Sequence, residues 1–156
     1  MAVEVGKPAP DFTLPGSDNT DDGRRDYSLA EYRGQAVVLV FYPGDSTPVC
    51  TRQLNAYTED IESFTGAGAQ VLAVSPQSVA SHDEFSCKQG GFGFPLLADT
   101  DKEVGEAYGI LGPLGFYRRS AFVIDATGIV RYAHKAVAGL TFRSTDELVK
   151  AVQAAS

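Results

Sequence analysis

The run AVVLVFYPGDSTPVC, residues 36–50, decides the fold of this 156-residue chain. Its first seven residues, Ala36 to Tyr42, are all apolar or aromatic, which predicts a strand buried on both faces, as in a parallel sheet. A helix is predicted from about Pro48 to Phe64, because apolar side chains recur there at helical spacing, at Leu54, Tyr57, Ile61 and Phe64. Cys50 is therefore expected in the first turn of a helix that follows a buried strand.

The first turn of a helix favours a negatively charged side chain. Its backbone N–H groups lack partners within the helix, and the positive end of the helix dipole lies there. Cysteines at helix N-termini or beside Arg have pKa values lowered from ~8.5 to roughly 3.5–7.5, and the thiolate is the nucleophilic form. We therefore expect Cys50 to be a reactive thiolate. The alternative is a buried structural cysteine, the commonest role of cysteine in a reduced protein.

The residues that lead into Cys50 have both a structural and a functional interpretation. Pro43 cannot donate a ladder hydrogen bond and so ends the strand, while Pro48 suits an early helical position. Thr47 lies three residues before Cys50, so its hydroxyl and N–H could point at the same small volume as the sulfur. Thr47 would equally serve as the N-cap of the helix. The two interpretations of Thr47 are compatible.

In the pattern Pro-x-x-x-Thr-x-x-Cys, these residues resemble the peroxidatic site of the peroxiredoxins. Three further stretches resemble motifs of that family in the same order, GKPAPDFTL at 6–14, FPLLAD at 94–99 and RSAFVID at 119–125. The resemblance runs from about Gly6 to Lys150. It implies a thioredoxin-like α/β fold with a central mixed sheet flanked by helices. It also implies reduction of hydrogen peroxide and small organic hydroperoxides through a cysteine sulfenic acid.

Within this resemblance, the catalytic roles fall on Cys50, Thr47, Arg119 and Pro43. Attack of the sulfur on one peroxide oxygen leaves negative charge on the other, so donors are needed along the path of the departing oxygen. Arg119 offers a fixed fork of charged donors and Thr47 a hydroxyl with its N–H. Pro43 would shield the thiolate from water. Arg118 should point to the opposite face of the strand, as a solvated charge.

One residue departs from the family pattern. The family usually has Glu three residues after the peroxidatic cysteine, where it braces the Arg, but this chain has Gln53. An amide oxygen still accepts a hydrogen bond but carries no charge. The bracing of Arg119 is therefore expected to be weaker, or to come from another residue.

The resemblance also implies a partner for the oxidised sulfur. In the bacterioferritin comigratory protein (PrxQ) branch, the resolving cysteine lies either five residues past the peroxidatic one or in the next helix. The first position is Asn55 here, which leaves Cys87. An intramolecular Cys50 to Cys87 disulfide, recycled by a dithiol protein such as thioredoxin, follows from the resemblance. The alternative is a one-Cys peroxiredoxin in which an external thiol resolves the sulfenic acid.

Helical geometry gives Cys87 an accessible position. It falls in a helix predicted from Val79 to Gln89 that ends at Gly90-Gly91. Cys87 lies about 200° around that helix from the apolar Phe85, at ~100° per residue. A disulfide needs Cα atoms within about 7 Å, which residues in two packed helices seldom satisfy. We therefore predict that the turn at Cys50, the segment around Cys87, or both, unwind on oxidation.

Three rival functions have weaker support in the sequence. A thiol-disulfide oxidoreductase needs C-x-x-C, but Thr51-Arg52-Gln53 follows Cys50. A Cys-His hydrolase needs a partner histidine, and neither His82 nor His134 lies in a recognisable pairing motif. Both histidines are interpreted as ordinary surface or hydrogen-bonded residues. The third rival is a non-catalytic thioredoxin-fold chaperone or binding module.

Composition narrows the partners and the location. The net charge of -7 argues against nucleic acid. Two Cys and two His at no clustered spacing give no support to a metal site, and no glycine-rich phosphate motif indicates a nucleotide cofactor. No signal-type segment or run of ~20 apolar residues is present, so we expect a cytoplasmic protein that does not bind membranes. We expect a monomer, with a dimer as the alternative.

The remaining pattern predicts one domain, residues 1–156, in which parallel strands are followed by an antiparallel hairpin and a closing helix. The polar run from Asp18 to Asp26 is expected to be a hairpin tip or an exposed loop. The other elements are predicted as a strand at Gln70 to Ser75, a short helix near Lys102 to Tyr108, hairpin strands at Ser120 to Asp125 and Ile129 to His134, and a helix at about Thr145 to Ala154.

Overall fold

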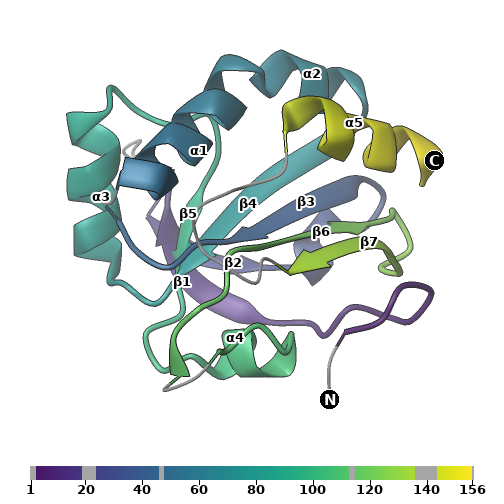
Figure 1. Ribbon diagram of the computed structural model, residues 1–156, viewed down its shortest axis with the longest axis horizontal. Coiled ribbons are helices and arrows are strands. Elements are labelled where there is room, and N and C mark those ends of the chain that lie inside the picture. Colours follow the sequence, from purple (N-terminus) through teal and green to yellow (C-terminus); the bar gives the residue numbers. More distant parts are fainter. Residues whose placement is uncertain (1–2, 19–23, 46–47, 113–114, 136–143, 156) are drawn as a thin grey trace.

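The computed structural model describes residues 3–18, 24–45, 48–112, 115–135 and 144–155, which fold around one seven-stranded sheet (Figure 1). The strands, in the order in which they lie across it, are β2 (Arg25–Ser28), β1 (Thr13–Ser17), β5 (Leu96–Ala98), β4 (Ala69–Ser75), β3 (Ala36–Phe41), β6 (Ser120–Ile124) and β7 (Val130–Lys135). β3, β4 and β5 are parallel, and the other neighbours pair antiparallel. The predicted mixed α/β sheet is confirmed.

Strand β3 forms the centre of both layers of the core, because its side chains alternate between the two faces of the sheet. Leu39 and Phe41 pack into one hydrophobic cluster, and Val38 and Val40 into the other; all four are fully buried. A strand buried on both faces reads as a continuous apolar run. The sequence of β3 predicted its central position for this reason.

Helices cover both faces of the sheet. Figure 1 shows α1 (Pro48–Glu59), α2 (Ile61–Gly66) and α5 (Thr145–Ala154) on one face, while α4 (Glu103–Ala107) lies on the other. α3 (Val79–Lys88) lies beside β1 and β5, and a 3-10 turn spans Ala30–Tyr32. Residues 42–47 connect the carboxyl end of β3 to α1. β6 begins at that same edge of the sheet, where Ser120 lies opposite Phe41.

The helix predicted from Pro48 to Phe64 is broken in the structure. α1 ends at Glu59, and Asp60, with φ -101° and ψ 18°, precedes α2. The break turns the chain so that Tyr57 and Phe64 are both fully buried, with ring centroids 5.9 Å apart and the rings nearly perpendicular. The single-helix prediction failed here because the apolar spacing continues across the bend.

The N-terminal region contains strands that the sequence pattern did not predict. β1 and β2 pair antiparallel, and Asp26 of the polar run lies in β2 opposite Pro15. The antiparallel strands on either side of the run from Asp18 to Asp26 agree with the hairpin tip expected there, although Arg25 and Asp26 already belong to β2. Polar side chains suit this strand at the edge of the sheet, where they meet water on one face. Residues 19–23 of that run lie outside the described residues.

The C-terminal elements follow the prediction closely. β6 and β7 form the expected hairpin, in which Gly128 has φ +91°, a conformation that favours glycine. α5 spans Thr145–Ala154 as predicted, and the Ser144 side chain caps it by accepting a hydrogen bond from the N–H of Glu147 at 3.2 Å.

Candidate active site

Cys50 lies in the first turn of α1, as the sequence predicted. It is the third residue of a 12-residue helix, and its side chain is fully buried in the cluster beneath α1. The positive end of the helix dipole and the first-turn N–H groups therefore act on the sulfur from one side. Burial keeps water away from the sulfur, so electrostatic interactions between the sulfur and nearby charged groups are weakly screened.

Arg119 approaches the sulfur from the sheet. It immediately precedes β6 and is 3% exposed, and its Nη2 donates a hydrogen bond to Sγ of Cys50 over 3.2 Å. The neighbouring Arg118 is exposed, as the alternation of side chains along a strand predicted. A guanidinium at this distance offers charged N–H donors to the sulfur and to an oxygen that departs from it.

Gln53 holds the guanidinium in place from the same helix as Cys50. Its Oε1 accepts a hydrogen bond from Nη1 of Arg119, and its Nε2 donates to the hydroxyl of Tyr57 over 3.3 Å. Burial raises the pKa of Tyr57 to about 12, so this phenol stays neutral. Gln53 therefore occupies the bracing position itself, with an amide oxygen in place of a carboxylate.

Two of the predicted site residues lie in the approach loop, residues 42–47, which connects β3 to the helix of Cys50. Pro43 follows β3 and is half-buried, at the start of the loop that leads to Cys50. Thr47 lies outside the described residues. The geometry around the sulfur consequently rests on Arg119 and on the first turn of α1.

Cys87 lies in the last turn of α3 and is exposed, as its helical position predicted. Both cysteines are free thiols in this structure, Cys50 buried and Cys87 exposed. α1 meets the end of α3 nearby, because Nδ2 of Asn55 donates to Oε1 of Gln89 over 2.9 Å. The structure thus brings the helix of Cys50 and the end of the Cys87 helix into contact without joining the sulfurs.

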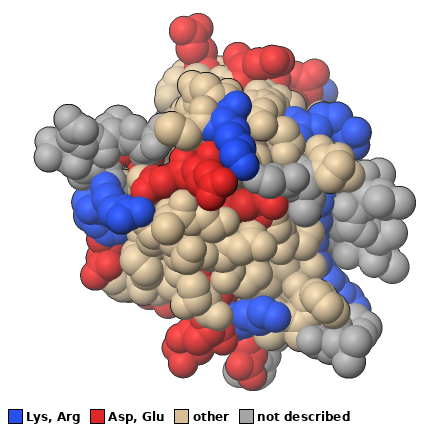
Figure 2. Space-filling view, turned by 90° about the vertical axis from the view of Figure 1, so that its left-hand side faces the viewer, with Lys and Arg blue, Asp and Glu red and all other residues tan. Residues whose placement is uncertain are grey.

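The surface around α3 carries charges of both signs. Arg24 pairs with Asp83 at 2.6 Å, and Lys88 with Glu84 at 3.1 Å, all on exposed or half-exposed side chains. Figure 2 shows acidic and basic side chains interleaved on this side of the molecule. A partner that approaches Cys87 therefore meets a mixed surface.

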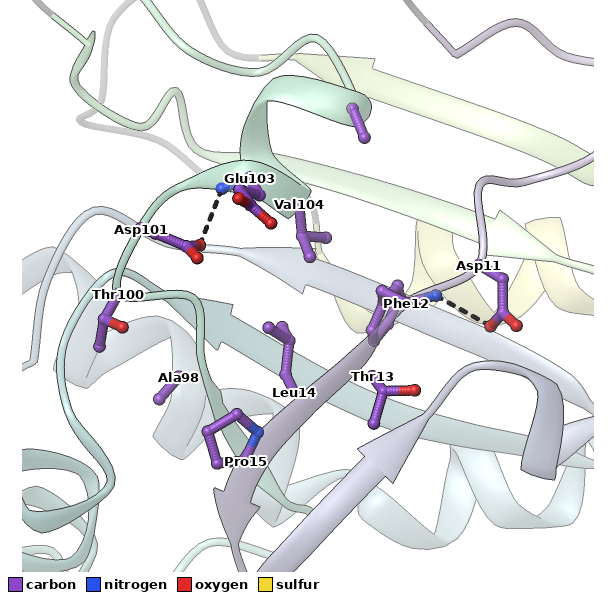
Figure 3. A pocket seen from close by; sticks show the side chains of 11 residues that line it. Asp11, Phe12, Thr13, Leu14, Pro15, Ala98, Thr100, Asp101, Glu103 and Val104 are labelled. Atoms are coloured by element: carbon purple, nitrogen blue, oxygen red, sulfur yellow. Dashed lines mark hydrogen bonds between the residues drawn. The ribbon is translucent and has the colours of Figure 1, made fainter.

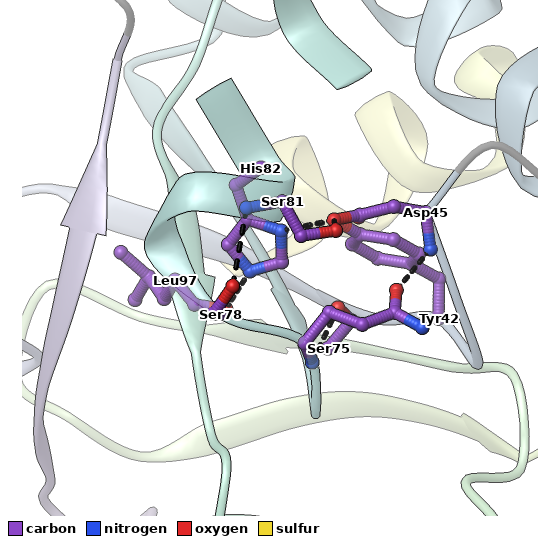
Figure 4. A network of polar contacts seen from close by, with 8 residues as sticks. Tyr42, Asp45, Ser75, Ser78, Ser81, His82 and Leu97 are labelled. Atoms are coloured by element: carbon purple, nitrogen blue, oxygen red, sulfur yellow. Dashed lines mark hydrogen bonds and ion pairs between the residues drawn. The ribbon is translucent and has the colours of Figure 1, made fainter. Parts of the chain in front are cut away.

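A buried polar network behind the approach loop is the feature that sequence reasoning missed (Figure 4). Asp45, two residues after Pro43, contacts Tyr42, Ser81 and His82. Burial alone would raise the pKa of Asp45, but the hydrogen bonds from these side chains and the charge of His82 outweigh it and lower that pKa. His82 is hydrogen-bonded, as expected, but fully buried, and nothing in its sequence neighbourhood indicates Asp45 as its partner.

A separate hollow of about 430 Å³ lies between β1 and the segment around α4 (Figure 3). Two of its three carboxylates already accept backbone hydrogen bonds, since Asp11 accepts from the N–H of Phe12 at 2.9 Å and Asp101 from that of Glu103 at 3.2 Å. Neither Cys50 nor Arg119 lines it. We assign this hollow no part in the chemistry of the sulfur.

The described residues contain neither a membrane-spanning helix nor a cluster of metal ligands. No helix among them has the length and hydrophobicity that crossing a bilayer requires. Within the part of the chain that the structure covers, no group of three or more His, Cys, Asp or Glu side chains is placed to hold a metal ion. The site is accordingly described from the side chains of this chain alone.

Comparisons with known proteins identify the family of this chain. The profile of the AhpC/TSA family matches residues 5–133. Peroxiredoxin-2 of Rattus norvegicus is 40% identical over 160 residues, which cover 97% of this chain and 79% of that protein. The reduced 2-Cys peroxiredoxin of Plasmodium vivax superposes with a TM-score of 0.87 at 27% identity, over 96% of this chain and 94% of that one.

A solved structure from a second branch is similarly close. The bacterioferritin comigratory protein of Xanthomonas campestris has a TM-score of 0.82 at 31% identity, over 97% of this chain and 98% of that one. The similar proteins thus include 2-Cys peroxiredoxins as well as a bacterioferritin comigratory protein. They support the thioredoxin-like fold and the family, and they divide between branches.

Proposed function

Because this chain belongs to the AhpC/TSA family of peroxiredoxins, and is therefore a thiol-dependent peroxidase, we propose that Cys50 is the sulfur that attacks the peroxide. The observation that carries this proposal is the 3.2 Å hydrogen bond from Nη2 of Arg119 to Sγ of the buried Cys50. Few arrangements other than nucleophilic chemistry require a guanidinium to be buried against a cysteine at a helix N-terminus.

In the first step, the thiolate of Cys50 attacks one peroxide oxygen and the O–O bond breaks. The other oxygen leaves with the electron pair, takes up a proton, and departs as water or an alcohol, while Cys50 becomes a sulfenic acid. Arg119 stabilises the charge that develops on the leaving oxygen. We assign Thr47 a second donor at this oxygen and Pro43 the shielding of the sulfur.

For the second step we propose that Cys87 resolves the sulfenic acid. Its thiol would displace the hydroxyl of the sulfenic acid as water and form a Cys50 to Cys87 disulfide. Cys87 is the only other cysteine of the chain, and its exposure makes it available. The contact of Asn55 with Gln89 supports the proposal, because it keeps the end of the Cys87 helix against α1.

We further assign the chain to the bacterioferritin comigratory protein (PrxQ) branch, with hydrogen peroxide and small organic hydroperoxides as substrates. The Xanthomonas campestris relative is described as having alkyl peroxide reduction activity, which supports the organic substrates. A disulfide whose Cys87 half lies at the surface suits reduction by a dithiol protein such as thioredoxin.

One observation favours a second scheme, in which an external thiol resolves the sulfenic acid. Cys50 is fully buried in one helix and Cys87 is exposed on another formed helix, so the disulfide requires local unwinding. A one-Cys peroxidase needs only enough opening to admit a small thiol. Cys87 would then have no role.

Intact mass spectrometry without reductant separates the two schemes. After one equivalent of hydrogen peroxide, loss of two hydrogens that peptide mapping assigns to Cys50 and Cys87 is the result we expect. A stable gain of one oxygen would favour the one-Cys scheme. Turnover with thioredoxin as the sole reductant is the second arm, and its absence beside turnover with a small thiol would contradict the proposed recycling.

A further inference from the structure

The buried pair of Asp45 and His82 is the strongest feature that the peroxidase chemistry does not yet use (Figure 4). Asp45 stands in the loop between β3 and Cys50, and its side chain is 4% exposed; that of His82 in α3 is fully buried. The two side chains lie 37 positions apart in sequence, yet Nδ1 of His82 is 2.7 Å from Oδ2 of Asp45. The pair ties the approach loop of Cys50 to a different element of the fold.

Several elements converge on this one carboxylate. The Tyr42 hydroxyl donates to Oδ1 over 2.6 Å, and the Ser81 hydroxyl donates to Oδ2 over 2.7 Å. The backbone N–H of Asp45 donates to the side-chain oxygen of Gln77. Asp45, five residues before the reactive cysteine, is therefore held by three parts of the fold. These are the end of β3, the segment before α3, and α3 itself.

The hydrogen-bond partners of the two ring nitrogens of His82 bear on where the ring carries hydrogen. Nε2 of His82 is 2.9 Å from the carbonyl oxygen of Leu97, which can only accept, so Nε2 must carry a hydrogen. Nδ1 faces the Asp45 carboxylate, which also only accepts when ionised. The Tyr42 hydroxyl, 3.4 Å from Nδ1, already donates to Asp45. The imidazolium is the form of the ring in which both nitrogens donate to these acceptors.

We propose that His82 is a positioning residue of the peroxidase: as a buried imidazolium anchored on Leu97, it fixes the Asp45 carboxylate, five residues before Cys50, and so helps to hold Cys50 against Arg119. This inference rests on the proposed role of Cys50. In-line attack tolerates little misplacement, since an error of ~1 Å at a reacting atom can cost ~10²-fold in rate. His82 does not contact the peroxide, yet it influences how accurately the sulfur of Cys50 is placed for attack.

Two substitutions of His82 separate this role from simple support of the fold. In His82→Asn the amide nitrogen lies near the former Nδ1 and still donates to Asp45, whereas in His82→Gln it lies near the former Nε2 and donates to Leu97 instead. We expect the rate constant of Cys50 with hydrogen peroxide to fall roughly 10-fold to 10²-fold in the Gln variant and less in the Asn variant. Asp83→Asn is the matched control, because it breaks the exposed pair with Arg24 on the same helix and should leave the rate unchanged.

Alkylation of Cys50 by iodoacetamide, measured on the same variants lacking Cys87, supplies the second readout. Alkylation requires an ionised Cys50 but not the in-line geometry that peroxide cleavage requires. The ratio of the peroxide rate constant to the alkylation rate constant should therefore fall in His82→Gln. Equal rates in all variants, or a parallel change of both reactions, would overturn the positioning role while leaving the peroxidase proposal intact. A wild-type Cys50 that does not react with peroxide would overturn both.

The protonation state is tested in the wild-type chain, so that no variant has to fold. Nitrogen-15 spectra of the His82 ring at neutral pH should show hydrogens on both nitrogens. A single neutral tautomer would contradict the imidazolium and remove the basis of the proposal.

Discussion

In the proposed reaction, the guanidinium of Arg119 acts on the reactive sulfur, and its two terminal nitrogens contact two residues of α1. Nη2 of Arg119 faces Cys50 while Nη1 is held by Gln53, so the planar fork cannot rotate away without losing both contacts. Cys50 and Gln53 lie about one turn apart on α1, so the first two turns of this helix carry both the proposed nucleophile and the side chain that holds Arg119.

Removal of the guanidinium tests its role at the residue scale. Arg119→Met should lower the second-order rate constant for hydrogen peroxide by about 10²-fold to 10³-fold, the usual cost of losing one preorganised donor at a developing oxyanion. Arg119→Lys should recover only part of the loss, because a point charge cannot reach Gln53 and the sulfur together. Rapid mixing followed by intact mass measures both, and an undiminished rate in the Met variant would contradict the assignment.

Gln53 offers a graded test of the bracing. Gln53→Leu leaves the buried Nη1 without its acceptor, so we expect a free energy of unfolding lower by about 1–3 kcal/mol and a peroxide rate lower by roughly 10-fold. Gln53→Glu keeps an acceptor at the same place and should stay within a few-fold of the natural rate. Chemical denaturation and peroxide kinetics on the pair decide the matter; equal behaviour of Leu and Glu would speak against a bracing role.

At the scale of elements, the proposed Cys50 to Cys87 disulfide requires two helix ends to open. Cys50 lies in the first turn of α1 and Cys87 in the last turn of α3, and both turns are formed when the thiols are free. Local opening costs the least free energy at helix ends, because the terminal N–H and C=O groups have no hydrogen-bond partners within the helix. His82 lies in the middle of α3 and is held on both sides, so opening of this helix should stop before it.

Hydrogen exchange tests this boundary. In the oxidised chain, amides of residues 86–88 and of the first turn of α1 should exchange faster than in the reduced chain, whereas the amide of His82 should keep its protection. Cys87→Ser, oxidised in the same way, serves as the control and should keep slow exchange at the end of α3. Unchanged exchange at both helix ends in a disulfide-bonded chain would contradict local unwinding.

At the scale of the whole molecule, one carboxylate links stability to pH. Burial alone would raise the pKa of Asp125, but hydrogen bonds from Thr127, Ile129 and Arg131 outweigh it and hold that pKa well below its usual value. A group whose pKa is depressed by folding contributes stability above its unfolded pKa of about 3.9, and that contribution is lost as the pH falls through the folded value.

Asp125→Asn should therefore matter at neutral pH and little in acid. We expect its free energy of unfolding at pH 7 to fall by about 1–3 kcal/mol relative to the natural chain, because hydrogen bonds to a charged acceptor are lost in the β6–β7 turn. The two chains should converge as the pH drops below about 4. Denaturation curves across pH measure this, and a constant difference down to pH 2 would contradict the linkage.

The parts of this molecule that local pattern specifies were predictable, and those that depend on distant pairing were not. The continuous apolar run of β3 and the motif around Cys50 identified the strand and the start of the helix, and the resemblance of residues 119–125 indicated Arg119, which the structure places against Cys50. The bounds of the edge strand β2 were not predicted, because its polar residues resemble the hairpin tip that precedes them. The pairing of Asp45 with His82 was missed because only the folded sheet and α3 bring those two side chains together.

The central claim is that Cys50 reacts with peroxide under the control of Arg119, and one kinetic comparison tests it most directly. Since the chain has no Trp to report the reaction by its fluorescence, reduced Cys87→Ser protein is mixed with one equivalent of hydrogen peroxide, quenched at intervals and weighed intact. We predict that one oxygen is added to Cys50 far faster than to free cysteine under the same conditions, and that the further change Arg119→Met slows this by about 10²-fold or more. Oxygen addition at the rate of free cysteine, or a rate indifferent to Arg119, would contradict the account.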